Sequence, residues 1–95
     1  MITREGDRLL LQGPVTIGTV SALLAQARTL LEQGAAVLDF AGVTEVDSAA
    51  VALALECLRE ARTRKLALSL ANLPEAMQHL AELYAVSELL QASPA

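Results

Sequence analysis

The residue types best suited to chemistry lie together in the segment Val46-Asp47-Ser48, just before an apolar run. An aspartate or serine at the start of a helix caps it by accepting a hydrogen bond from an otherwise unpaired backbone amide, and capping is the simplest interpretation. A serine hydroxyl there also lies beside free amides at the positive end of the helix dipole, which stabilises a phosphate. Ser48 is therefore a candidate for capping and for phosphorylation.

The same helix offers a candidate surface for another protein. Side chains four and eight positions after Ser48 lie on one side of a helix, and these are Ala52 and Glu56. An exposed alanine permits close approach by a partner. We therefore predict a protein-contact surface that consists of Asp47, Ser48, Ala49, Ala52 and Glu56.

Other candidates for catalysis or metal binding are few. His79 is the only histidine and is expected to face solvent, while Cys57, the only cysteine, falls among alanines and is expected to be a buried small hydrophobe. Glu45 and Asp47 are separated by one residue, which indicates a loop rather than a paired acid–base site. Phosphate-binding and dinucleotide-binding glycine motifs and metal-ligand spacings are absent. We predict a protein that is not an enzyme and uses no metal or cofactor.

Composition excludes further classes of function. The 95 residues are 54% apolar, with one Tyr, one Phe and no Trp, which suits a single domain over residues 1–95 with an aliphatic core. The net charge is −4 without any basic cluster, so nucleic-acid binding is not expected. The longest apolar run, residues 49–55, is too short for membrane insertion, and the first residues lack the apolar stretch of a signal peptide. With one cysteine, these features predict a cytoplasmic protein.

Strand and helix signals alternate in the first half of the chain. Two short strands, residues 2–5 and 8–13, flank a Gly-Asp turn, and the second ends at Gly-Pro. Gly34 is expected to cap the C-terminus of a helix over residues 16–33. The buried face of that helix is predicted to comprise Ile17, Val20, Leu24, Ala27 and Leu31.

The third strand and second helix are predicted from apolar patterns. Residues 36–40 form an apolar run typical of a buried strand, and residues 41–46 form a loop with some extended character. The second helix is predicted over residues 49–63. Small residues on one side of it allow close packing against a sheet: Ala50, Ala54, Cys57 and Ala61.

The last elements are a strand and a helix. Period-two alternation predicts the strand over residues 65–70, and Pro74 is expected at the first position of the helix that follows. A short apolar tail over residues 86–90 and a frayed end over residues 93–95 complete the chain. The buried face of the helix is predicted to comprise Leu73, Met77, Leu80 and Tyr84.

The order of elements is therefore β-β-α-β-α-β-α. Alternating strands and helices indicate a mostly parallel sheet with right-handed crossovers. We predict an α/β fold in which about four strands form a small mixed sheet and three helices pack against it.

Over nearly all of its length the chain resembles a STAS domain, the fold of bacterial anti-sigma-factor antagonists. Residues 36–43, Ala-Val-Leu-Asp-Phe-Ala-Gly-Val, resemble the strand that precedes the family's Val-Asp-Ser/Thr motif, which is here Val46-Asp47-Ser48. The segment that begins Asn72-Leu73-Pro74 and continues through residues 80–86 resembles the family's last strand-to-helix segment. The resemblance implies the STAS fold.

The resemblance also implies a role for Ser48, which matches the phosphorylated Ser or Thr of the antagonists. Those proteins typically continue with Ser-Gly, whereas Ala49-Ala50 follow here. In its minimal size and richness in Ala and Leu, the chain is more similar to the STAS subunits of Mla-type phospholipid transporters. That similarity implies an accessory subunit bound to the ATPase subunit of an ABC transporter at the inner membrane. The alternative is an anti-sigma-factor antagonist whose partners are an anti-sigma factor and a kinase.

Overall fold

Four strands form one mixed sheet in the computed structural model, which describes residues 1–86 and 89–90. The strands follow one another across the sheet in the order of the sequence: β1 (Ile2–Glu5), β2 (Arg8–Val15), β3 (Val37–Val46) and β4 (Ser69–Ala71). β1 pairs antiparallel with β2, whereas β2 with β3 and β3 with β4 pair parallel. The predicted mixed, mostly parallel sheet is confirmed.

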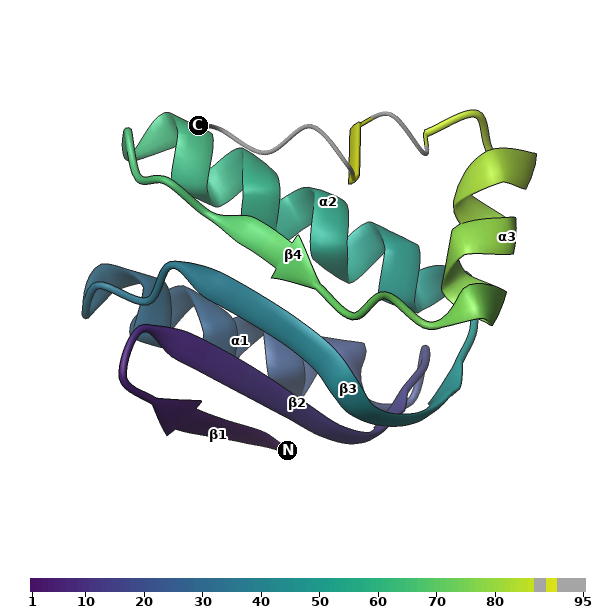
Figure 1. The fold of residues 1–95 in the computed structure, drawn as a ribbon, viewed down its shortest axis with the longest axis horizontal. Coiled ribbons are helices and arrows are strands. Elements are labelled where there is room, and N and C mark those ends of the chain that lie inside the picture. Colours follow the sequence, from purple (N-terminus) through teal and green to yellow (C-terminus); the bar gives the residue numbers. More distant parts are fainter. Residues whose placement is uncertain (87–88, 91–95) are drawn as a thin grey trace.

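Three helices connect or follow the strands: α1 (Val20–Glu32), α2 (Ser48–Thr63) and α3 (Glu75–Leu83). Figure 1 shows α1 behind β2 and β3, α2 behind β4, and α3 beside α2 at one end of the sheet. The predicted element order is therefore confirmed. None of the helices in the described part of the chain is long and apolar enough to cross a lipid bilayer.

The core lies between the helices and one face of the sheet. Leu9 and Leu11 of β2 have no exposed area, whereas Leu10 between them is partly exposed. Leu38 and Phe40 repeat this spacing on β3 and are each 1% exposed. Because successive side chains of a strand point to opposite faces, these four side chains share one face. The predicted small residues of α2 complete the core, each at most 1% exposed: Ala50, Ala54, Cys57 and Ala61.

The first helix starts later than predicted, at Val20 rather than at residue 16. Thr16 and Thr19 close a turn before it, because the Thr16 amide donates to Thr19 Oγ1 at 3.0 Å and the Thr19 amide donates to the Thr16 carbonyl at 2.9 Å. Hydroxyl groups compete in this way with helical hydrogen bonding. The prediction that Ile17 is buried is wrong, since 79% of its surface is exposed.

The rest of the predicted α1 face is largely confirmed. Ala27 and Leu31 are buried, Val20 and Leu24 are half-buried, and the fully buried Leu23 was not predicted. At the end of the helix the backbone passes through Gln33 into Gly34, whose φ of 98° suits a glycine, as the predicted cap requires.

Two strands are longer than predicted because they pair with each other. β2 continues through Pro14 to Val15, and β3 continues through residues 41–46, which were predicted to form a loop. Two register shifts accommodate the extension, one of them at Pro14. The strands approach closely at Gly42, where a Cβ atom would lie 2.9 Å from the Leu11 carbonyl oxygen. β4 is shorter than the predicted strand over residues 65–70.

The last helix also differs at its ends. Pro74 is the N-cap and precedes α3, so the predicted position of the proline is off by one residue. Met77 is buried, but the prediction that Tyr84 is buried is wrong, because Tyr84 follows the last helical residue and is 49% exposed. Residues 87–88 of the predicted tail and the whole predicted frayed end, residues 93–95, lie outside the described residues.

Candidate docking site

The start of α2 is fixed by the carboxylate of Asp47. Asp47 is the N-cap residue, and its Oδ1 accepts a hydrogen bond from the Ala49 amide at 2.8 Å. Its other oxygen, Oδ2, accepts a hydrogen bond from the Ile17 amide at 3.0 Å. An ordinary N-cap serves only its own helix. Asp47 in addition ties the turn before α1 to the start of α2.

The sheet register explains why these segments meet. Val15 at the end of β2 lies opposite Val46 at the end of β3. Because the two strands are parallel, their carboxyl ends share one edge of the sheet, and the chain enters α1 and α2 from that edge. At this end of the sheet the first residue of α2, Ser48, is exposed, whereas the next three residues are buried.

Ser48 and Ala52 form the exposed part of this surface. Ser48 is the first residue of α2, and Ala52 lies one turn further; both are exposed. The cap is provided by Asp47, which leaves the Ser48 hydroxyl free of that role. Ala49, also predicted as a contact residue, is 7% exposed and offers a partner almost no side-chain surface. A short hydroxyl and a methyl group therefore project from a rigid base.

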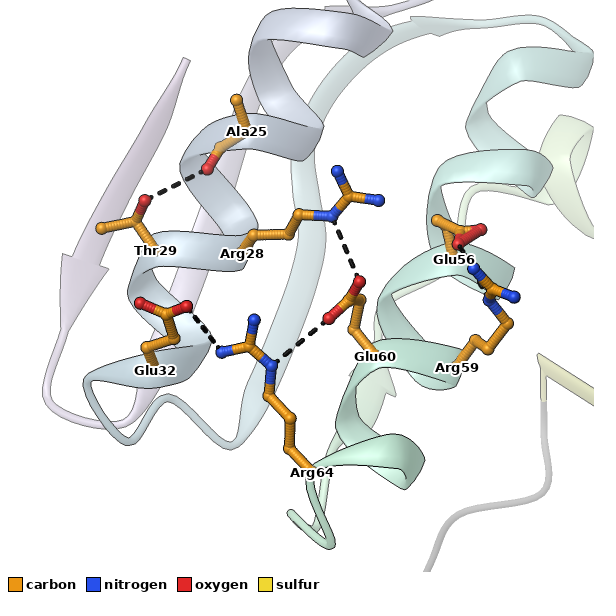
Figure 2. Close-up of polar contacts among 8 residues, drawn as sticks. All are labelled: Ala25, Arg28, Thr29, Glu32, Glu56, Arg59, Glu60 and Arg64. Carbon is orange, nitrogen blue, oxygen red and sulfur yellow. Dashed lines mark hydrogen bonds and ion pairs between the residues drawn. The ribbon is translucent and has the colours of Figure 1, made fainter.

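Glu56 lies at the far end of the predicted contact surface and already has a partner. Its Oε1 is 2.9 Å from Arg59 Nη2, and its side chain is 29% exposed (Figure 2). Of the predicted contact residues, Asp47, Ser48 and Ala52 gather at the start of α2, while Glu56 lies two turns away in an ion pair.

Side chains considered for catalysis lie apart from one another. His79 is exposed on α3, with Nε2 3.7 Å from Glu75 Oε1, and Cys57 is 1% exposed in the core. Burial raises the pKa of the Cys57 thiol to about 12, so it remains protonated. Among the described residues no three metal-ligating side chains come together.

A second polar cluster, around Asp39 in β3, was missed by the sequence analysis. Asp39 Oδ2 accepts a hydrogen bond from Arg8 Nη1 at 2.6 Å, and Oδ1 accepts from Asn72 Nδ2 at 3.0 Å and from the Ala41 amide at 2.9 Å. Burial alone would raise the pKa of this carboxyl, but the hydrogen bonds and the Arg8 charge outweigh burial and lower it. The signal that could have revealed this cluster is a charged residue, Asp39, inside an apolar run.

Similarity to known structures identifies the class of fold. SpoIIAA, an anti-sigma factor antagonist in its unphosphorylated form, matches with a TM-score of 0.65 and 21% sequence identity, over 87% of this chain and 81% of that chain. The four-stranded mixed sheet with three helices is therefore the STAS fold, in agreement with the expectation from sequence.

The family within that class is also shown. A family model described as MlaB, STAS domain, matches residues 1–91, and the chain belongs to this MlaB-type STAS family. STAS domains act through contacts with other proteins, which agrees with the predicted protein partner.

Two further structures match parts of much longer proteins. Mglu is 33% identical with a TM-score of 0.57, over 79% of this chain and 19% of that chain. Its native form is 26% identical with a TM-score of 0.55, over 78% of this chain and 22% of that chain. The chain therefore corresponds to about one fifth of Mglu. A search of the curated proteins finds no match.

Proposed function

We propose that this chain is a non-catalytic accessory subunit that binds and supports the ATPase of a Mla-type phospholipid-transporting ABC transporter. The observation that carries the proposal is the match of the MlaB-type family model to residues 1–91. In this role the subunit sits in the cytoplasm, attached to the inner membrane through the transporter, and contributes to the lipid asymmetry of the outer membrane.

The start of α2 supports the proposal because it meets the physical requirements of a docking surface. Ser48 and Ala52 are short, so a partner can approach the helix closely. Beneath them Ala50 and Leu53 are at most 1% exposed, and Asp47 fixes the first turn. A surface that is rigid before binding loses little conformational entropy when it docks.

Binding to the ATPase tests the proposal directly. The dissociation constant of the wild-type complex is measured by calorimetry and compared with that of Ala52→Arg. We expect Ala52→Arg to fold normally and to weaken binding by roughly 100-fold or more, because a long charged side chain blocks the approach at the centre of the interface. The matched control is Ala25→Arg, at an exposed position of α1, and should bind like the wild type. A wild-type chain that forms no complex with the ATPase contradicts the proposal.

Ser48 gives a second test of the same surface. Ser48→Asp adds a charge without enlarging the side chain much, and the helix keeps its Asp47 cap. We expect the free energy of unfolding to stay close to that of the wild type and the affinity for the ATPase to fall by roughly tenfold, because the added carboxylate loses hydration in the interface. Ser48→Asn is the neutral control. Equal affinity of the two variants would show that Ser48 lies outside the interface.

The alternative function is that of an anti-sigma-factor antagonist in a partner-switching circuit. Two observations favour it: the fold is that of SpoIIAA, and the Ser48 hydroxyl is exposed at the N-terminus of α2, where phosphate is stabilised. It predicts a kinase partner that transfers phosphate from ATP to Ser48. Mass spectrometry of the chain from its native cells provides the test. If Ser48 stays unmodified under every growth condition, a partner switch that depends on its phosphorylation is ruled out.

A further inference from the structure

Ile17, in the turn before α1, is the most exposed large apolar side chain of the described residues. It is 79% exposed, compared with 76% for Leu83 and 72% for Met1. Single exposed apolar residues are common on protein surfaces, so this exposure alone does not indicate a function. Two other features distinguish Ile17: its fixed position and its surroundings.

The position of Ile17 is fixed by hydrogen bonds on every side of the turn. The Thr16 amide donates to Thr19 Oγ1, which in turn donates to the Pro14 carbonyl, both at 3.0 Å. The Ile17 amide itself donates to Asp47 Oδ2 at 3.0 Å. Since the same carboxylate caps α2, one side chain links the backbone at Ile17 to the start of α2. The exposed side chain is thus presented by a turn that is held by hydrogen bonds.

Two carboxylates lie at the same end of the sheet as the turn that carries Ile17. Glu45 is exposed near the end of β3, opposite Pro14 of β2, at the same edge of the sheet as the turn. Within residues 1–86 and 89–90, neither Glu45 nor Asp47 forms an ion pair. An exposed apolar side chain and an unpaired carboxylate at the same end of a sheet are complementary to a partner that offers an apolar pocket and a cationic residue nearby.

We infer that Ile17 is a third docking residue, together with Ser48 and Ala52, and that it enters an apolar pocket of the ATPase partner bordered by a lysine or arginine that faces Glu45. This inference rests on the proposed function and names a part of the same interface that follows β2 rather than β3. Asp47 is then a positioning residue, because it aligns the turn with α2.

Affinity for the ATPase decides whether Ile17 contacts the partner. Ile17→Ser should weaken binding by roughly 10- to 100-fold, the expected effect of removing a buried aliphatic side chain, and Ile17→Val should cause a smaller loss. The thermal midpoint of the free chain should not change, since the exposed side chain contributes little to the core. The control is Leu83→Ser, a similar change at an equally exposed position, which should bind within about twofold of the wild type.

The outcomes separate this inference from the proposed function. If Ile17→Ser binds the ATPase as tightly as the wild type while Ala52→Arg binds it much more weakly, the role of Ile17 is overturned and docking through α2 is retained. Absence of binding by the wild-type chain would overturn both. Glu45→Lys tests the charge: we expect slower association and a weaker dependence on salt than in the wild type, and an unchanged rate would overturn the cationic border.

The positioning role of Asp47 has separate readouts. In NMR spectra of the free chain, Asp47→Ala should shift the Ile17 amide signal and speed its hydrogen exchange, because the acceptor of that amide is lost. In a double-mutant cycle on affinity, the losses from Asp47→Ala and Ile17→Ser should be less than additive, since the first already displaces the side chain that the second removes. Fully additive losses would overturn the positioning role.

Discussion

Two aspartates associated with β3 use their carboxylates in different ways. Asp39 is the third residue of the strand, is 6% exposed, and binds Arg8, Asn72 and the Ala41 amide. Asp47 follows the end of the strand, is half-buried, and binds only two backbone amides. The first carboxylate links β2 and β3 to the residue that follows β4. The second sets the geometry of a surface and leaves its side chains exposed to a partner.

The far end of α2 extends this comparison. There Glu60 forms ion pairs with Arg28 at 3.4 Å and with Arg64 at 3.3 Å, and Arg64 also lies 2.8 Å from Glu32 of α1 (Figure 2). Four charged side chains at this end are therefore partnered within the chain: Arg28, Glu32, Glu60 and Arg64. The edge that carries Asp47 lacks such pairs among the described residues. Under the proposed function, the open end serves recognition, whereas the charges of the paired end are already engaged within the chain.

The largest effect on stability is expected from Asp39→Ala. It removes the acceptor of two amide donors and the partner of Arg8, although the 42% exposed Arg8 side chain can still be hydrated. We expect the free energy of unfolding in urea to fall by about 2 kcal/mol. Asp39→Asn keeps one acceptor oxygen and should lose about half as much. Neither variant should change the affinity for the ATPase. If Asp39→Ala has the same free energy of unfolding as the wild type, the structural role of Asp39 is contradicted.

The acid stability of the chain is expected to depend on the same carboxyl. Because the pKa of Asp39 is lower in the folded chain than its ordinary value of 3.8, the unfolded chain binds the proton first as the pH falls. The stability from Asp39 is complete above that ordinary value and is lost as the pH falls through the folded-state pKa. In Asp39→Asn, the free energy of unfolding should therefore decrease less steeply than in the wild type as the pH falls below that ordinary value. Asp7→Asn, at an exposed turn, is the charge control.

Much of the fold could be predicted because its signals are local. The small-residue stripe of α2 repeats with the period of the helix, so it predicts both the element and its buried face. The Asp-Ser signal placed the start of α2 within one residue. The exposure of Ser48 and Ala52, the centre of the candidate site, followed from the same helical period.

What could not be predicted depends on contacts between distant residues. The start of α1 and the exposure of Ile17 are set partly by Asp47, 30 residues away in the sequence. The Asp39 cluster depends on Arg8 and Asn72, 31 and 33 residues away. A helical period extrapolated through the Thr16–Thr19 turn instead placed Ile17 in the core. The sequence therefore did not predict that Ile17 belongs to the proposed site. Its position relative to α2 depends on the parallel pairing of β2 with β3, which brings the ends of the two strands together.

A smaller effect on stability, with a large effect on recognition, is expected from Asp47→Ala. Loss of the N-cap should lower the free energy of unfolding by about 1 kcal/mol. Ser48→Ala should change it by less than about 0.5 kcal/mol, because the cap belongs to Asp47. The affinity of Asp47→Ala for the ATPase should nevertheless fall by roughly tenfold or more, since both parts of the surface shift. Urea denaturation and calorimetry measure the two effects. Equal destabilisation by Asp47→Ala and Ser48→Ala would contradict the assignment of the cap.

The smallest effect is expected from Glu60→Gln, at the opposite end of α2. The substitution breaks the ion pairs to Arg28 and Arg64, but these arginines are 44% and 34% exposed, so water and salt already screen the charges. We expect a loss of about 0.5 kcal/mol at low salt that nearly vanishes in about 1 M NaCl, where the screening length is about 3 Å. Affinity for the ATPase should not change. A weaker complex with Glu60→Gln would mean that recognition extends along the whole helix, and the separation between a paired, stabilising end and an open, docking end would fail.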